Sequence, residues 1–300
     1  MIAQLAALVS SLAVALPSLS FDSDTRPWPA GVTYRVAGTE SVAFGPSTVF
    51  PQGSDVWLFD GPTHAFVRVG PEGQIRSRVF VTGLAHTFVV RDDGSIAWVD
   101  LTRGRVAVVD KRGVIQLDNP LAPGLKHVRR MVAGADGALW LHTAYQETFR
   151  VPLDRDADLK EWFQGKREGL VFESEPAVGA TVSVRGGRVH LTLFTPPETP
   201  GEGAVKQEGP TVDPGEEALA ADLVGGDQEG WWIRVTLGTP GAARDRLIRV
   251  DRASEVTFAT DLDGPGTLSW PDTLWVRPDG SVVQILSTDQ GIRVRSWRAP

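Results

Sequence analysis

The sequence contains no cysteine and a single asparagine, Asn119, among its 300 residues. Without cysteine there are no disulfide scaffolds, cysteine-based metal sites or thiol catalysis. A basic surface is lacking too: 37 acidic residues face 30 basic ones, and the net charge is −7. Because phosphate binding needs a concentrated cationic face, nucleic acid is not an expected partner.

Runs of Ala, Glu, Lys and Leu that build long helices are also scarce, whereas the chain has 32 Gly, 21 Pro and 10 Trp. This composition is typical of strands joined by tight turns. With 42% hydrophobic residues, the chain is long enough to bury a large core. We therefore expect an all-β protein with little helix.

The N-terminal segment differs from the rest of the chain. Residues 1–20 carry no charge, and residues 2–16 are almost continuously apolar. This pattern predicts a signal peptide cleaved near Ser20, a single mature domain over residues 21–300, and a periplasmic or extracellular location. The apolar stretch is shorter than a spanning helix needs, so no integral membrane segment is expected after removal. A retained membrane anchor or a misassigned start codon is the alternative.

One pattern recurs six times: a tight turn, often Asp-Gly, followed by a short apolar run that often contains Trp. The copies lie at residues 53–58, 93–99, 136–141, 186–191, 229–233 and 279–283. Their first apolar residues stand at 56, 96, 139, 189, 231 and 282, which gives steps of 40 to 51 residues. Such a period is typical of propeller blades, each built around a hairpin whose turn glycine accepts a positive φ.

A further strand with a basic residue among apolar ones follows most copies, as in residues 66–69, 247–251 and 292–294. The sequence therefore predicts a six-bladed β-propeller with four-stranded blades. The last copy ends after its third strand, near Trp297, so a strand from near the N-terminus must close the last blade. Residues 31–36 are the predicted closing strand.

Two segments depart from the repeat. Residues 195–217 are rich in Pro, Gly and Glu, which predicts an acidic loop that replaces or extends the outer half of the fourth blade. This loop is either a solvated connection or an arm that covers a ligand or binds a partner. The irregular segment at residues 154–168 predicts a short helix near residues 159–163.

The Asp-Gly-x-apolar-Trp-apolar copies at residues 93–99 and 136–141 resemble NHL-type propellers and the group of virginiamycin B lyase-like six-bladed propellers. The resemblance implies a blade fold and specifies no activity. Related propeller enzymes of the gluconolactonase group hold a divalent metal in the central tunnel with carboxylate and asparagine ligands. This chain departs from that pattern, since Asn119 falls in an outer-strand turn. A lyase of the virginiamycin B type would need a histidine and an acid near the axis.

Position in the repeat indicates which side chains lie near the axis, because the first strand of each blade lines it. The residues eight positions before each turn glycine are Gly45, His86, Arg129, Gly179, Asp222 and Asp272. In a six-fold ring, His86 would face Asp222 and Arg129 would face Asp272. These pairs would either close a packed axis as ion pairs or line an open funnel. His127 and Trp270, near blade entrances, complete the predicted ligand-binding set.

No Ser/His/Asp spacing, phosphate loop or calcium loop is present. The leading hypothesis is an exported, monomeric binding or scaffold propeller without a cofactor, whose partner is a protein or a small polar ligand. Its rival is a propeller enzyme, a lyase or lactonase, with a divalent cation in the tunnel and with His86, His127, Asp222 or Asp272 at the site. A sensor domain is a third alternative.

Overall fold

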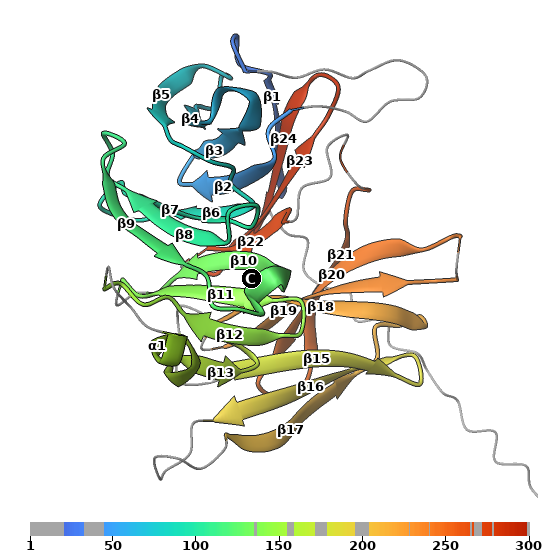
Figure 1. Ribbon diagram of the computed structural model, residues 1–300. Coiled ribbons are helices and arrows are strands. Elements are labelled where there is room, and N and C mark those ends of the chain that lie inside the picture. The colour runs from blue at the N-terminus through green and yellow to red at the C-terminus, as the bar shows by residue number, and fades with distance from the viewer. Residues whose placement is uncertain are drawn as a thin grey trace, which may run out of the picture.

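The structure, a computed structural model, describes residues 21–32, 45–134, 137–154, 159–171, 179–195, 204–227, 229–239, 241–264, 266, 272–277 and 279–298. Six four-stranded antiparallel sheets form the blades of a β-propeller (Figure 1), which confirms the predicted fold. Blade one contains β2 (Thr48–Gln52), β3 (Asp55–Asp60), β4 (Ala65–Val69) and β5 (Ile75–Phe80). Blade two contains β6 (Thr87–Val90), β7 (Ile96–Asp100), β8 (Arg105–Val109) and β9 (Ile115–Pro120).

Blade three contains β10 (Val128–Ala133), β11 (Leu139–Thr143), β12 (Glu147–Arg150) and β13 (Lys166–Glu168). Blade four contains β14 (Leu170–Val171), β15 (Gly179–Arg185), β16 (Arg188–Thr195) and β17 (Val205–Val212). Blade five contains β18 (Ala218–Asp227), β19 (Gly230–Leu237), β20 (Arg244–Asp251) and β21 (Val256–Asp261). Blade six contains β22 (Leu274–Val276), β23 (Val282–Ser287), β24 (Gly291–Trp297) and β1 (Phe21–Pro27).

The described helices are short. They are the 3-10 turns η1 (Gly61–Thr63) and η2 (Leu125–His127) and the α-helix α1 (Leu159–Gln164). The last of these confirms the helix expected near residues 159–163 and packs beside β12.

The Asp-Gly-Ser turns show why the repeated pattern forms hairpins. In blade two, the Asp93 carboxylate accepts hydrogen bonds from the Ser95 backbone N–H at 2.8 Å and from its hydroxyl at 2.5 Å. Gly94, between them, has a φ of 80°, which glycine adopts without strain. Asp279 and Ser281 repeat this geometry in blade six, and the hydrogen bonds from Ser281, together with Arg298, lower the pKa of Asp279 to about 2.

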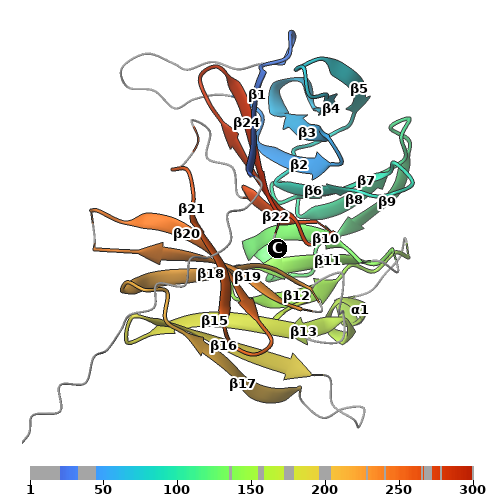
Figure 2. The ribbon, with the colours of Figure 1, turned by 180° about the vertical axis from the view of Figure 1, so that it is seen from behind.

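The ring is closed by β1, which pairs with β24 from Phe21↔Trp297 to Pro27↔Gly291. Figures 1 and 2 show the blue β1 beside the red β24 from both sides. Closure by an N-terminal strand is thus confirmed, but its placement at residues 31–36 is wrong. Gly31 lies in a turn, and residues 33–36 fall outside the described ones. The closing strand has the sequence Phe-Asp-Ser-Asp-Thr-Arg-Pro and is mostly polar. It lies at the outer edge of its sheet, where fewer side chains are buried than in an inner strand.

Blade four is built differently from the others. Its first strand, β14, is two residues long and pairs with β15 only at Leu170↔Ala180 and Val171↔Gly179. Part of the segment predicted as an acidic loop at 195–217 is strand β17, which pairs with β16 along the outer edge of the sheet. The loop interpretation is therefore wrong for Val205–Val212, because this polar and mostly exposed segment forms a strand by backbone pairing with β16, without an apolar run that would reveal it in the sequence.

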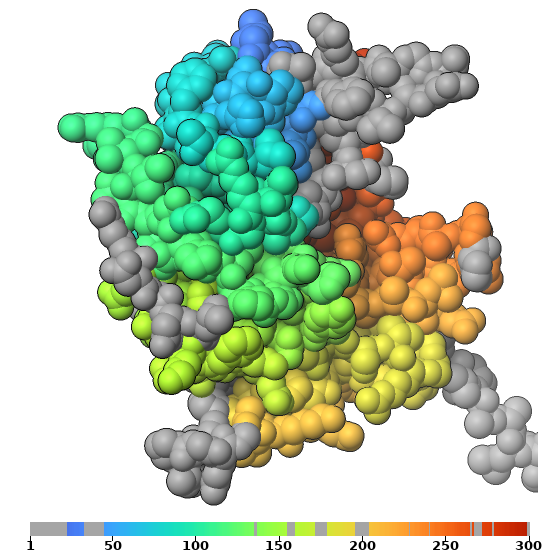
Figure 3. All heavy atoms as spheres, in the orientation of Figure 1, coloured from blue at the N-terminus to red at the C-terminus, as the bar shows by residue number. Residues whose placement is uncertain are grey.

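Hydrophobic clusters fill the spaces between neighbouring blades. Five clusters join blades one and two, two and three, four and five, five and six, and six and one. Trp57, Trp98, Trp231 and Trp232 lie buried in these clusters, where their large rings pack between neighbouring sheets. In the space-filling view (Figure 3), the colours of blades one to five follow one another in chain order over the visible face.

The boundary between blades three and four has no such cluster among the described residues, and side-chain hydrogen bonds connect the two blades there. His142 Nε2 donates to the Val171 carbonyl at 2.9 Å, and the Thr148 hydroxyl donates to the Gly169 carbonyl at 2.8 Å. Gln146 bonds the backbone of Val182 through both ends of its amide. Polar contacts hold this one junction of the ring.

Candidate functional site

Charged side chains surround a hollow beside the N-terminal ends of the inner strands β10 and β22 and the middle of the inner strand β18. We call it the N-side hollow. Its volume is about 80 Å³, enough for a handful of water molecules or a ligand of similar size. The charged residues that line it are Arg129, Arg130, Asp222, Arg234 and Asp272. Three guanidinium groups therefore face two carboxylates.

Arg130 forms the floor of the N-side hollow. Its guanidinium donates to both carboxylate oxygens of Asp272, to the Val224 carbonyl at 2.7 Å and to the Leu274 carbonyl at 2.6 Å. The side chains of Arg130 and Asp272 are only 14% and 18% exposed. This ion pair therefore ties blade three to blades five and six across the axis and separates the N-side hollow from the space beyond it.

The second ion-pair group lies nearer the solvent. Asp222 receives hydrogen bonds from Arg234 on its own blade and from Arg129 on blade three, the latter at 3.0 Å. Burial alone would raise the pKa of Asp222, but the hydrogen bonds and charges of Arg234 and Arg129 outweigh it and lower this pKa. Asp222 is therefore ionised at neutral pH. Arg129 is 57% exposed and has donors left for a ligand.

The remaining polar wall comes from the end of β11 and the turn after it. His142 is buried, and its ring donates to the Val171 carbonyl. Burial, reinforced by the nearby charge of Arg130, lowers the pKa of His142 to about 3. The imidazole is therefore neutral at physiological pH and adds no charge to the hollow. Gln146 and Thr143 also line this wall.

The structure brings together part of the predicted site. Arg129, Asp222 and Asp272 all line the N-side hollow. The predicted facing pairs are wrong, because Arg129 pairs with Asp222 and the partner of Asp272 is Arg130.

The two histidines of the predicted set lie outside the N-side hollow. His86 Nε2 donates to the Val128 carbonyl of the next blade at 3.0 Å, so the side chain joins blades two and three. The His127 ring packs edge-on against Tyr145, with their centroids 5.2 Å apart. Trp270 falls outside the described residues.

Most of the lining lies outside the predicted set, and four of these residues carry charge or hydrogen-bonding groups that the site depends on: Arg130, His142, Gln146 and Arg234. Arg130 stands next to the predicted Arg129, and a register shift in β10 between Val128 and Arg130 brings both side chains to the hollow. In a regular strand, neighbouring side chains point to opposite faces, and a bulge relaxes this alternation. His142 and Arg234 lie on the second strands of their blades, and Gln146 lies in a turn. Counting back from the turn glycines identifies residues of first strands only.

Within the described part of the chain, no group of three or more His, Asp or Glu side chains is arranged to hold a metal ion. No helix in that part combines the length and the apolar character needed to cross a membrane.

No protein-family model and no curated protein matches the sequence. Solved structures do match over nearly the whole chain. A streptogramin B lyase has a TM-score of 0.50 at 11% identity and covers 93% of this chain and 98% of its own. A Bacteroides fragilis protein whose name calls it exported has a TM-score of 0.52 at 9% identity and covers 94% and 95%. A virginiamycin B lyase variant from Staphylococcus aureus has a TM-score of 0.48 at 10% identity and covers 92% and 99%.

Similarity at these identities shows a shared fold. Fold and site together define a six-bladed β-propeller whose axis is closed by an ion pair and carries a charged hollow on one side. Its fold is similar to the folds of the streptogramin B lyase and of the Bacteroides fragilis protein, and it is the six-bladed propeller that the sequence motifs predicted.

Proposed function

We propose that the protein is an exported, monomeric binding module that holds a small, negatively charged polar ligand in the N-side hollow without transforming it. The observation that carries this proposal is the charge of the site. Three guanidinium groups and two carboxylates share one hollow, and His142 beside them is neutral. The described side chains thus give the hollow a net positive charge, which favours an anion.

Hydrogen-bonding capacity supports the same ligand class. Asp272 is saturated by Arg130, whereas Arg129 at the rim uses one nitrogen on Asp222. A guanidinium has five N–H donors in a fork that matches carboxylate geometry. A carboxylate at the rim can therefore bind Arg129 and Arg234 without displacing the ion pair of the floor.

A library screen by thermal shift tests the proposal. The library contains mono- and dicarboxylates, sugar acids and neutral sugars, and we expect the stabilising compounds to be anions. Each stabilising compound is then incubated with the protein and analysed by mass spectrometry for chemical change. Conversion of the compound would replace the binding hypothesis by the enzyme hypothesis. Stabilisation by neutral sugars alone would contradict the charge argument.

Export is proposed from residues 1–20, whose apolar, uncharged character fits a signal peptide. The closing strand β1 begins at Phe21, so cleavage near Ser20 leaves the ring intact. N-terminal sequencing of the protein recovered from the periplasm or medium should give a start close to Phe21. A mature chain that keeps residues 1–20, or one cut beyond Pro27, would contradict this part of the proposal.

A further inference from the structure

A second hollow lies on the far side of Arg130, at the C-terminal ends of the inner strands. We call it the C-side hollow. Its volume is about 140 Å³, and its walls are mostly apolar, with Phe50, Val89, Met131, Ala133, Trp275 and Val276 among them. An apolar cavity of about 150 Å³ is large enough to take benzene. The C-side hollow is therefore the size of one small aromatic ring.

Three charged residues border the C-side hollow: Arg130, Asp227 and Arg277. Two of them are fully engaged by protein groups. Arg130 is held by Asp272 and by the carbonyls of Val224 and Leu274. The two hollows therefore share the Arg130 side chain as a wall, and the positive charge of Arg130 is already compensated by Asp272.

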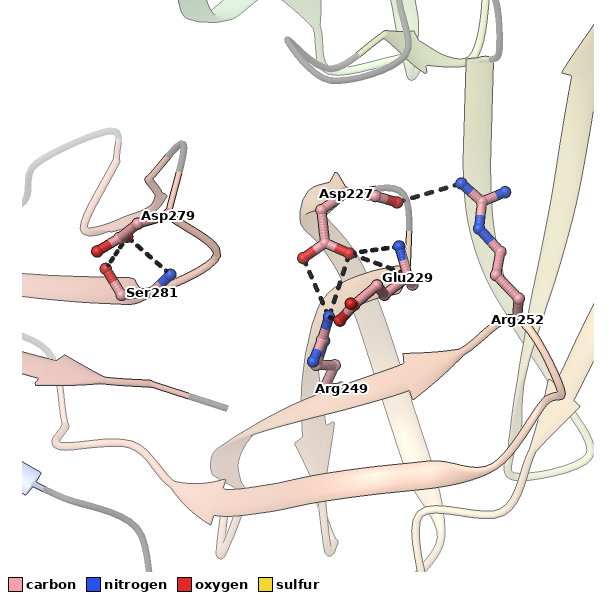
Figure 4. A network of polar contacts seen from close by, with 7 residues as sticks. Asp227, Glu229, Arg249, Arg252, Asp279 and Ser281 are labelled. Atoms are coloured by element: carbon pink, nitrogen blue, oxygen red, sulfur yellow. Dashed lines mark hydrogen bonds and ion pairs between the residues drawn. The ribbon is translucent and has the colours of Figure 1, made fainter. Parts of the chain in front are cut away.

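Asp227 is likewise compensated. Its carboxylate is 3.1 Å from the Arg249 guanidinium and accepts backbone N–H groups of Glu229 and Gly230 at 2.9 Å (Figure 4). These charge-assisted hydrogen bonds compensate the negative charge of the Asp227 carboxylate. Asp227 therefore exerts little repulsion on an anion at the opposite side of the C-side hollow.

Arg277 is the exception. Its side chain is half-buried, and its described partner is the Gly53 carbonyl at 2.9 Å. Among the residues that the structure describes, no carboxylate lies within ion-pair distance of it. The nearby acid, Asp279, is turned to Ser281 (Figure 4) and to Arg298, which is 2.7 Å away. Burial lowers the pKa of Arg277 below its ordinary value, as expected for a cation without a full counter-charge.

We propose that the C-side hollow is a second ligand site, which binds a small aromatic monocarboxylate with its ring among the apolar walls and its carboxylate on Arg277. Apolar burial supplies affinity for the ring, and the guanidinium fork fixes the orientation of the carboxylate. The site is independent of the ligand proposed for the N-side hollow, because the Arg130 floor separates the two.

Benzoate is the probe for this site, and the full-length mature protein is titrated by calorimetry and by ligand-observed NMR. We expect saturable binding in the millimolar range or tighter. Arg277→Gln should weaken it about tenfold or more, because a charged hydrogen bond to the carboxylate is lost, whereas Arg277→Lys should retain part of the affinity. Acetate, which lacks the ring, and benzyl alcohol, which lacks the charge, should both bind more weakly than benzoate.

Two variants test the location of this site. Ala133→Phe places a ring in the C-side wall and should abolish benzoate binding while circular dichroism remains that of the wild type. Arg167→Gln, on the exposed strand β13 and away from both hollows, should leave benzoate binding unchanged. The inference is overturned if benzoate does not bind the wild type, if binding is indifferent to Arg277→Gln, or if Arg167→Gln abolishes it.

Discussion

The Gln146 side chain completes a strand ladder at Val182. Its amide nitrogen donates to the Val182 carbonyl at 2.9 Å, and its amide oxygen accepts the Val182 N–H at 2.8 Å. The pairing of β14 with β15 reaches Ala180 and goes no further along β15. The Gln146 amide then bonds the backbone of Val182, two residues on, at the same edge of β15. A single side chain thus continues the short inner strand of blade four and joins blades three and four.

Loss of this amide should destabilise the ring at its polar junction. Gln146→Ala leaves a backbone donor and acceptor of Val182 without partners, and we expect the free energy of unfolding to fall by about 1–3 kcal/mol. Urea unfolding followed by tryptophan fluorescence measures the change. Gln207→Ala, on the exposed face of β17, is the matched control and should change stability by less than about 0.5 kcal/mol. Equal effects of the two substitutions would show that the junction does not depend on Gln146.

His142 should make stability depend on pH in the acid range. Its folded-state pKa is about 3 against an ordinary value of 6.5, so the unfolded chain binds a proton below 6.5 that the folded chain does not. Stability is therefore lost as pH falls from 6.5 towards 3, by up to about 1.4 kcal/mol per pH unit.

The contribution of His142 is isolated by comparison with His142→Gln, which can still donate a hydrogen bond but does not titrate. Unfolding curves of both proteins are recorded between neutral pH and pH 4. The wild type should lose more stability than the variant over this range. Titration of the Asp and Glu side chains contributes equally to both proteins, so the difference reports on His142. Parallel pH profiles would mean that the imidazole is not held neutral by burial.

Closure of the ring depends on the absence of a side chain at Gly291. This residue has a φ of 154°, and a Cβ there would lie 1.8 Å from the Arg26 carbonyl oxygen of β1. Gly291→Ala should therefore force β1 away from β24 and reduce stability by at least ~2 kcal/mol. Gly264→Ala, where an added Cβ meets nothing within 4 Å, is the control. Thermal unfolding that is unchanged in Gly291→Ala would contradict closure through β1.

Metal analysis separates the binding hypothesis from the enzyme hypothesis. We expect purified protein to carry no stoichiometric Mg, Ca or Zn in elemental analysis by plasma mass spectrometry. His86, a candidate ligand of a tunnel metal, donates Nε2–H to the Val128 carbonyl, which occupies that nitrogen. A stoichiometric metal that is lost in His86→Ala would favour the enzyme.

The blades could be predicted from the sequence because each depends on a local rule. Turn glycines such as Gly94 and Gly280 must adopt positive φ, and the apolar runs that follow them are buried on both faces in β7 and β23. Strands at the edge of a sheet obey no such rule. The polar β1 and the two-residue β14 are strands because their backbones pair with β24 and β15. Their own sequences carry no pattern that predicts this pairing.

The site could be predicted only to within a residue or two. Counting from the turns located Arg129, Asp222 and Asp272, but their partners depend on strand register. Bulges in β10 and β18 shift that register, so Arg130 rather than Arg129 reaches Asp272. Residues such as His142 and Arg234 reach the hollow from second strands, and only the packing of neighbouring blades places them there.

The most direct test of ligand binding in the N-side hollow is a calorimetric titration of the strongest stabilising anion from the library. The wild type is compared with Arg129→Gln and Arg234→Gln, and Arg167→Gln on the exposed strand β13 serves as the control. We predict that each rim substitution weakens binding about tenfold or more and that the control does not. Binding of equal affinity in all four proteins would place the ligand elsewhere and contradict the account.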